Sequence, residues 1–220
     1  MKRLIRLLLL MPLLAACEQE VYDKGDTAYS YMRADFVDAI VDGDKNVTTV
    51  TTDDGQQLQL TSPFTAKWIT TPDTTYRTVM YYNLKGEQAE VINMRQLTTM
   101  TIKSIYLFKG SFKSDPLTLE SAWLGGNKRY LNLGVIMKVG AVNQDDELQT
   151  VGVFADTLTV DDDGLRTYHI RLYHDQGGVP QYYSQRYFLS IPVGGLKADS
   201  LRLTVNTYDG MVVKGFRLRE

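Results

Sequence analysis

The sequence predicts an all-β protein, with a five-stranded OB-like barrel in its N-terminal part and a β-sandwich of about seven strands after it. Two observations carry this prediction. Apolar and polar residues alternate along several short runs, including YLNLGVIMKV (130–139), TYHIRLY (167–173) and LRLTVNTY (201–208). Turn signals separate such runs, among them DDG (53–55), KG (85–86), DDDG (161–164) and YDG (208–210).

The barrel strands are expected at 31–41, 46–52, 56–61, 75–84 and 88–105. The run SYMRADFVDAIV (30–41) could also form an amphipathic helix, but the turn sequence DGDKN follows it directly, which favours a strand that ends in a hairpin. Gly, Ser, Asp and Pro cluster in GSFKSDPL (110–117). We therefore expect the barrel to occupy residues 31–111 and the sandwich residues 112–220.

The N-terminus has the order of a secretory signal. Basic residues (Lys2, Arg3, Arg6) precede an apolar run over 7–14, and small residues lead into Cys17, the single cysteine of the chain. The apolar run is much shorter than the roughly 20 residues that span a bilayer. The alternative is a buried N-terminal helix with an incidental cysteine.

The run LAAC (14–17) resembles a bacterial lipobox. It implies that residues 1–16 are a lipoprotein signal peptide and that Cys17 carries the acyl chains of a lipid anchor, with 17–30 as a tether. Glu18 and Glu20, in EQE (18–20), resemble the acidic cluster that accompanies surface export in some Gram-negative anaerobes. We expect an outer membrane lipoprotein, facing either the periplasm or the cell surface. Thr27, in the sequence DTA, resembles an O-glycosylation site of such bacteria.

Charge argues against nucleic acid as a partner. Loss of residues 1–16 removes three of the 24 basic residues and leaves 21 against 26 acidic ones, a net charge of −5. OB barrels bind nucleic acid on their second and third strands with basic and aromatic side chains. Residues 46–66 contain no Lys or Arg, and their one aromatic residue is Phe64.

No catalytic or cofactor motif is recognised, so we expect no enzyme, no cofactor and no metal. Both a Gly-x-Ser-x-Gly elbow and a phosphate-binding glycine loop are absent from the sequence. His169 and His174, five residues apart in a predicted strand, would face opposite sides and could not share a metal. Asp42, Asp44 and Asn46 resemble half of a calcium loop, although Val47 replaces its glycine and a polar hairpin turn explains them equally well.

Aromatic residues gather in QYYSQRYF (181–188). Tyr182, Tyr183, Arg186 and Tyr187 are candidate contacts for a protein partner or a glycan. The alternative is that these residues fill the strand core and its rim. Gly125 and Gly126 could admit a ligand backbone, or they could form a turn or bulge beside Trp123.

Several segments together resemble the NigD-like bacterial lipoproteins: the lipobox, DDGQQLQL (53–60), TVMYYNL (78–84), LESAWLGGNKRYLNLGVIM (119–137) and YDGMVVKGFRL (208–218). The resemblance implies an OB-like domain followed by a β-sandwich. The family is named from a bacteriocin locus, which makes an immunity-related role one implication. We expect a membrane-anchored, non-enzymatic protein-binding module, and the alternative is a surface glycan-binding accessory lipoprotein.

Overall fold

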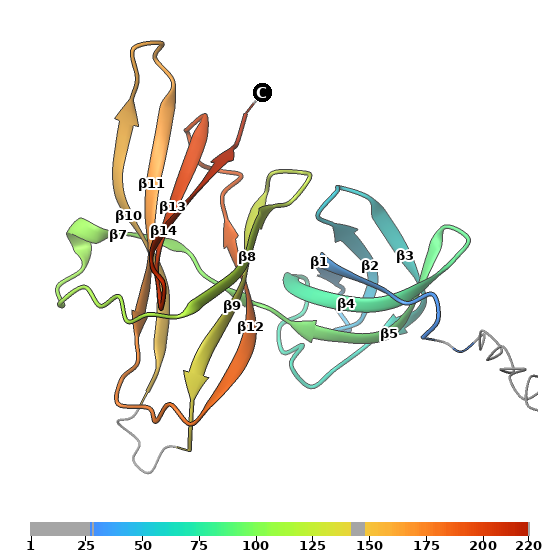
Figure 1. Ribbon diagram of the computed structural model, residues 1–220. Coiled ribbons are helices and arrows are strands. Elements are labelled where there is room, and N and C mark those ends of the chain that lie inside the picture. The colour runs from blue at the N-terminus through green and yellow to red at the C-terminus, as the bar shows by residue number, and fades with distance from the viewer. Residues whose placement is uncertain (1–26, 28, 142–147, 220) are drawn as a thin grey trace, which may run out of the picture. The chain divides into compact units, whose positions relative to one another are not determined.

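The computed structural model describes residues 27, 29–141 and 148–219, coloured along the chain in Figure 1. It divides into two units, Met1–Met32 and Arg33–Glu220, and the second unit holds every described strand. Among the described residues, no helix has the length and apolar character needed to cross a bilayer. The all-β prediction is confirmed.

The N-terminal strands close into a barrel. They are β1 (Arg33–Val41), β2 (Val47–Thr52), β3 (Gln57–Phe64), β4 (Thr75–Lys85) and β5 (Gln88–Gln96). The order around the barrel is β1-β2-β3-β5-β4, with β3 and β5 parallel and the other pairs antiparallel. This order is that of a Greek-key OB barrel. The strand expected over 31–41, rather than a helix, is therefore confirmed.

Side chains that alternate inward fill the barrel, among them Val37, Val50, Leu58 and Met80. Ile69, from the loop between β3 and β4, joins this core. The β1–β2 turn is held by the Asp42 carboxylate, which accepts hydrogen bonds from the backbone N–H groups of Asp44 and Asn46 at 3.0 and 2.8 Å. The carboxylate of Asp42 thus acts within a hairpin turn.

The expected fifth strand, 88–105, is too long. β5 ends at Gln96, and the buried Leu97 donates its N–H to the Arg77 carbonyl of β4 at 2.8 Å. The chain then leaves the barrel: β6 (Thr98–Thr99) pairs with β12, and β7 (Ile102–Ser104) pairs with β10. β6 and β7 are two and three residues long, too short for alternation to show where the chain changes sheets.

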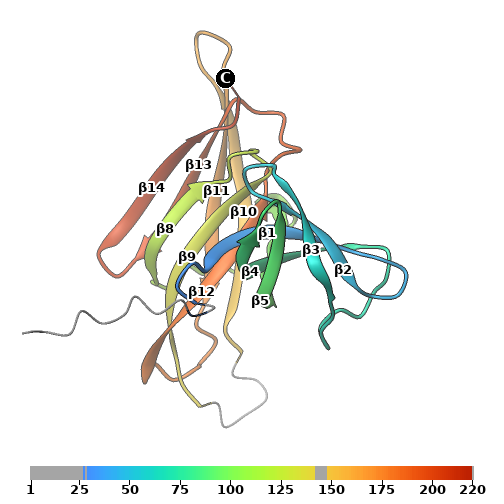
Figure 2. The same cartoon turned by 90° about the vertical axis from the view of Figure 1, so that its right-hand side faces the viewer.

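The C-terminal strands form two sheets, as a sandwich requires. Their bounds are β8 (Thr118–Leu124), β9 (Tyr130–Val139), β10 (Thr150–Val160), β11 (Arg166–Asp175), β12 (Tyr183–Pro192), β13 (Ser200–Thr207) and β14 (Gly210–Arg217). One sheet has the order β14-β13-β11-β10-β7 and the other β6-β12-β9-β8. β8, β9 and β12 can be followed side by side in Figure 2.

The four-stranded sheet has two different faces. On β9, Leu131, Leu133 and Val135 point into the sandwich core, where they meet Ile170, Leu201 and Leu203 of the other sheet. The residues between them on β9, including Tyr130 and Asn132, therefore lie on the outer face. The buried polar groups of the barrel contact this outer face.

Candidate functional site

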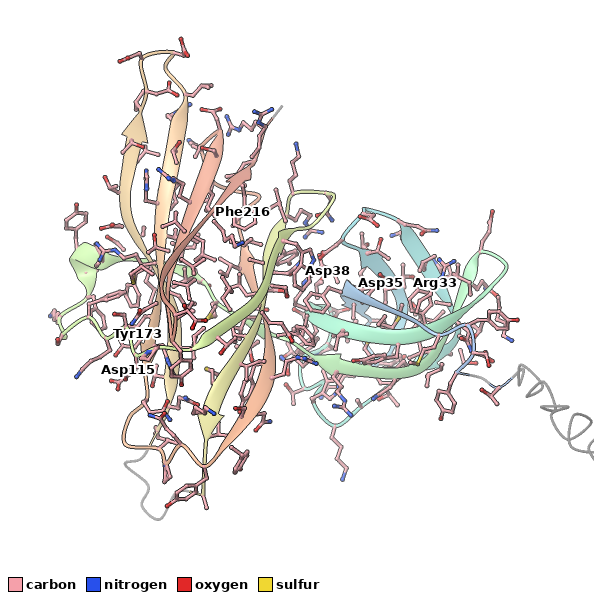
Figure 3. All side chains as sticks on the ribbon, viewed as in Figure 1. Arg33, Asp35, Asp38, Asp115, Tyr173 and Phe216 are labelled. Carbon is pink, nitrogen blue, oxygen red and sulfur yellow. The ribbon has the colours of Figure 1, made fainter. Side chains whose placement is uncertain are left out.

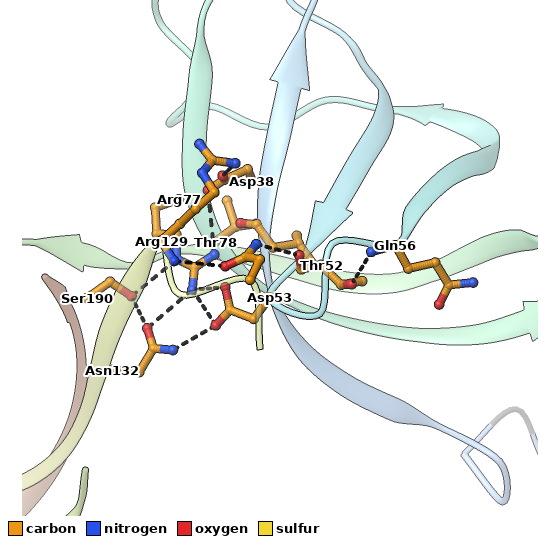
Figure 4. A network of polar contacts seen from close by, with 11 residues as sticks. Asp38, Thr52, Asp53, Gln56, Arg77, Thr78, Arg129, Asn132 and Ser190 are labelled. Carbon is orange, nitrogen blue, oxygen red and sulfur yellow. Dashed lines mark hydrogen bonds and ion pairs between the residues drawn. The ribbon is translucent and has the colours of Figure 1, made fainter. Parts of the chain in front are cut away.

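Arg77 of β4 lies at the centre of a buried polar network between the barrel and the outer face of the four-stranded sheet (Figure 4). Its Nη2 donates to the two carboxylate oxygens of Asp53 at 2.6 and 2.7 Å, and its Nη1 lies 3.5 Å from Oδ1 of Asp38. Its Nε donates to the Ser190 hydroxyl on β12 at 3.2 Å. Arg77 is only 6% exposed, so these partners replace its hydration.

The sandwich supplies the other half of this network. Asn132 donates to the Asp53 carboxylate at 2.7 Å and accepts from the Ser190 hydroxyl at 2.7 Å. The Tyr130 ring lies 4.0 Å from the Arg77 guanidinium carbon, close enough for a cation–π interaction. Burial raises the pKa of the Tyr130 phenol.

Arg129 completes the charge balance of the network. It lies 2.7 Å from the second carboxylate oxygen of Asp38, so two arginines meet two aspartates. We call Asp38, Asp53, Arg77, Arg129, Tyr130, Asn132 and Ser190 the junction network. Its members come from both the barrel and the sandwich, so the network links the two.

Two tight turns meet beside the network. A Cβ on Gly125 would lie 3.0 Å from Cγ of Asp53, and one on Gly126 would lie 2.5 Å from Oδ1 of Asp54. The Asn127 N–H donates to the Asp53 carbonyl at 2.7 Å. Gly125 and Gly126 therefore form the β8–β9 turn and let it approach the β2–β3 turn. Of the two alternatives that the sequence allowed, a ligand contact or a turn, the structure shows the turn.

A pocket of about 740 Å³ opens next to these turns. Five aromatic residues line it: Phe36, Tyr81, Tyr82, Trp123 and Phe188. We call the three whose rings contact one another, Phe36 of β1, Trp123 of β8 and Phe188 of β12, its aromatic floor. The Phe36 ring centroid lies 5.3 Å from that of Trp123 and 5.5 Å from that of Phe188, with interplanar angles of 49° and 75°. We call this cavity the junction pocket. Asp53 belongs to both the pocket wall and the network, so the network fixes one wall of the pocket.

The pocket rim carries more acidic than basic groups. Arg33 and Asp35 come from the start of β1 (Figure 3), and Asp53 and Asp54 come from the β2–β3 turn. The Tyr82 hydroxyl donates to Asp35 at 2.7 Å. Burial, together with this hydrogen bond, raises the pKa of Tyr82 to about 12. The Asp54 carboxylate is exposed and is paired with no cation among the described residues.

The structure does not bring the four sequence-predicted contact residues onto one face. Tyr182 and Tyr183 are 79% and 56% exposed, whereas Tyr187 is half-buried against the sandwich core. Alternation along β12 places Arg186 on the opposite face, with Phe188 and Ser190, where it pairs with Glu120 of β8. Tyr182 and Tyr183 thus remain accessible, while Arg186 belongs to the side of the junction pocket.

Of the two predicted modification sites, Cys17 and Thr27, the structure describes only Thr27. Cys17 lies outside the described residues. Thr27 is exposed, and its N–H donates to the Ser30 hydroxyl at 3.2 Å. An exposed hydroxyl is what an attached glycan needs, and the modification itself stays a prediction.

The histidines occupy opposite faces of β11, as their spacing predicts. His174 is buried, and its Nδ1 lies 2.9 Å from the Asp115 carbonyl oxygen. His169 is half-buried, and its Nε2 lies 2.9 Å from the Thr159 hydroxyl. Within the described ranges, no group of three or more His, Cys, Asp or Glu residues is arranged to hold a metal ion.

Sequence reasoning missed the junction network because its members are far apart along the chain. A signal was nevertheless present at Asp38, a charged residue in the otherwise apolar run FVDAIV (36–41). The segment that resembles NigD-like proteins also supplies Trp123, Gly125, Gly126, Tyr130 and Asn132 to this junction. These residues therefore lie where the sandwich meets the barrel.

No protein-family model matches the chain, and no curated protein matches it. Solved structures do share its fold. A NigD-like immunity protein from Bacteroides caccae matches with a TM-score of 0.61 at 21% identity, over 84% of this chain and 96% of that one. A protein described as toxin-related, from Parabacteroides distasonis, matches with a TM-score of 0.61 at 15% identity, over 86% of this chain and 93% of that one.

A protein described as a lipoprotein, from Bacteroides fragilis, matches with a TM-score of 0.57 at 13% identity, over 86% of this chain and 98% of that one. At these identities the likeness is one of fold. It confirms the barrel-plus-sandwich fold that the resemblance to NigD-like lipoproteins implies.

Proposed function

We propose that the chain is a lipid-anchored, non-enzymatic lipoprotein of the bacterial envelope that binds a protein partner at the junction pocket. The observation that carries this proposal is the pocket itself, with an aromatic floor, a polar rim and a volume of about 740 Å³. Ligand sites are typically concave and combine apolar walls with a few placed polar groups. The junction network holds one wall in place, as a preorganised site requires.

The anchor is proposed at Cys17, with the mature protein on the outer membrane, facing the periplasm or the cell surface. The support is the lipobox-like run LAAC and the similarity in fold to a protein described as a lipoprotein. Metabolic labelling with an alkyne fatty acid tests it: the wild-type chain should be labelled and Cys17→Ser should not. Equal labelling of both chains would contradict the anchor.

An immunity-related role is the form of protein binding that the comparisons suggest. The support is that a NigD-like immunity protein shares the fold. The acidic balance of the mature chain makes nucleic acid a poor candidate for the partner.

Capture from envelope and secreted fractions tests the proposed site. The bait is the tagged chain without residues 1–20, carrying either Asp54→Arg in the pocket rim or the matched change Asp44→Arg. Asp44 is an exposed carboxylate in the β1–β2 turn, outside the pocket lining. A partner held by the wild-type and Asp44→Arg baits but lost from Asp54→Arg supports the proposal. A partner retained equally by all three would place binding elsewhere.

Glycan binding is the second candidate, and of its four predicted contacts Tyr182, Tyr183, Arg186 and Tyr187 it keeps Tyr182 and Tyr183, because these two are exposed. Stacking on sugar rings needs accessible aromatic faces, which these two residues offer. A polysaccharide array tests it, with Tyr183→Ala as the variant. Binding that this substitution abolishes would favour the glycan reading over the protein partner.

A further inference from the structure

We infer that the junction pocket receives a cationic side chain, arginine or lysine, from the protein partner. This inference rests on the proposed function and names the chemistry that the pocket recognises. It follows from three features of the pocket: the balance of charge on its rim, the arrangement of its aromatic floor, and the position of Asp54.

The rim has a surplus of negative charge. Three carboxylates line the pocket, on Asp35, Asp53 and Asp54; Arg77 neutralises that of Asp53, which leaves Asp35 and Asp54 against the single guanidinium of Arg33. Arg77 and Asn132 already donate hydrogen bonds to the Asp53 carboxylate, and the Tyr82 hydroxyl donates one to Asp35. The Asp54 carboxylate is left exposed to solvent at the pocket edge. Ionised carboxylates only accept hydrogen bonds, so a donor with positive charge complements this rim.

Arg33 does not cancel this surplus where Asp54 lies. Arg33 interacts with the Tyr82 hydroxyl, on the side of the pocket formed by β1 and β4. Asp54 instead meets the Gly126 turn, at the end of the pocket that Trp123 and Gly125 line. The cation is therefore assigned to the space between Asp54 and the Trp123 ring.

The aromatic floor fits a cation better than a sugar. The Phe36 ring is inclined by 49° to Trp123 and by 75° to Phe188, so the three rings form no flat platform on which a sugar could stack. Aromatic rings at varied angles can instead surround an alkyl chain and its charged end. The neighbouring network shows the same pairing, since Arg77 lies 4.0 Å from the Tyr130 ring centroid and 5.7 Å from that of Phe36.

Titration calorimetry with short peptides tests the inference directly. The probe is acetyl-Gly-Gly-Arg-Gly-Gly-amide, and the matched control replaces arginine with citrulline, which has nearly the same shape without the charge. We expect the arginine peptide to bind at least about fivefold more tightly than the citrulline peptide, the size of a cation–π contact joined to a partly exposed ion pair. Asp54→Asn should remove that difference, while Asp44→Asn should keep it.

The outcomes separate this inference from the proposed function. Equal binding of the arginine and citrulline peptides, or binding of neither, would overturn the cationic ligand, and the capture experiment with Asp54→Arg would still decide whether the pocket is the partner site. Binding of maltohexaose that Asp54→Asn abolishes would overturn both proposals, because the pocket would then be a glycan site. A difference that persists in Asp54→Asn would move the cation away from Asp54 and contradict the assignment.

Discussion

The junction network and the aromatic run 181–188 contrast in how their residues come together. The aromatic run is continuous in sequence, and the strand separates it: Tyr187 turns to the sandwich core and Arg186 to the opposite face. The junction network is scattered from Asp38 to Ser190, and the fold gathers it around Arg77. Residues that are close in sequence were therefore divided between two faces, whereas buried charged residues that are far apart in sequence form one connected network.

The largest effect is expected from Arg77→Ala. This substitution leaves Asp38 and Asp53 without their buried cation, and breaking a buried ion pair from one side costs about 3–5 kcal/mol of unfolding free energy. Urea unfolding followed by circular dichroism measures it. Arg95→Ala, an exposed arginine on the adjacent β5, is the matched control and should change stability by less than about 0.5 kcal/mol. Similar losses in both variants would contradict a special contribution of the junction network to stability.

A smaller loss is expected from Gly125→Ala. The new Cβ would lie 3.0 Å from Cγ of Asp53, whose carboxylate is held by Arg77 and Asn132 and cannot easily move aside. Overpacking of this kind costs about 1–3 kcal/mol. Gly195→Ala, where a Cβ would meet no atom within 4 Å, serves as the control. The same unfolding assay should find it close to wild type, and a silent Gly125→Ala would show that the two turns can separate.

Within the aromatic run 181–188, substitutions of a core-facing and an exposed tyrosine should differ in their effect on stability. Tyr187 packs against the sandwich core, so Tyr187→Ala should lower the unfolding free energy by about 1–3 kcal/mol. Tyr182 is 79% exposed, so Tyr182→Ala should change it by less than about 0.5 kcal/mol. Thermal melts of the two variants make the comparison. Equal melting temperatures would contradict the division of this run between core and surface.

The subtlest effect concerns two tyrosines of β4. The Tyr76 hydroxyl accepts hydrogen bonds from the Thr70 and Thr71 segment, and these lower its pKa to about 8. Tyr82, beside the pocket, has its pKa raised to about 12 by burial and by Asp35. Absorbance at the tyrosinate band should show one group ionising near pH 8 that Tyr76→Phe removes. Tyr82→Phe should remove one that ionises near pH 12.

The two shifts act on stability in opposite directions. The lowered pKa of Tyr76 favours the ionised phenol in the folded chain, so its contribution grows as the pH rises from about 8 to 10 and is absent below that window. The raised pKa of Tyr82 favours the neutral phenol, so its contribution is complete below pH 10 and is lost as the pH rises toward 12. Unfolding measured from pH 7 to 11 in the two Phe variants would separate these slopes.

The sequence predicted much of the fold because alternation and turn residues are local signals. Four of the five barrel strands lie within three residues of their expected ends, since alternating runs such as FVDAIV are bounded by turn sequences such as DGDKN. The crossing at Leu97 was missed because β6 and β7 are two and three residues long, too short for alternation to show where the chain leaves the barrel. Which sheet a strand joins depends on partners distant in sequence, and no local pattern states them.

The candidate site was less predictable, for the same reason. Trp123, Gly125 and Gly126 stood out as part of the resemblance to NigD-like proteins, but their role depends on Asp53 and Asp54, about 70 residues earlier in the chain. The available signal was a charged residue inside an apolar strand run, as Asp38 is in FVDAIV. Such a residue is costly to bury without a partner and so predicts one.

The most direct test of the junction pocket as a binding site uses the two tryptophans of the chain as internal probes. Trp123 lines the pocket, whereas Trp68 packs against Tyr76 in the barrel, outside the pocket lining. Their indole N–H signals can be assigned in a ¹⁵N correlation spectrum with Trp68→Phe. On titration with the arginine peptide, the Trp123 signal should shift saturably and the Trp68 signal should stay in place. A stationary Trp123 signal, or equal shifts of both, would contradict the pocket as the site where a cationic partner binds.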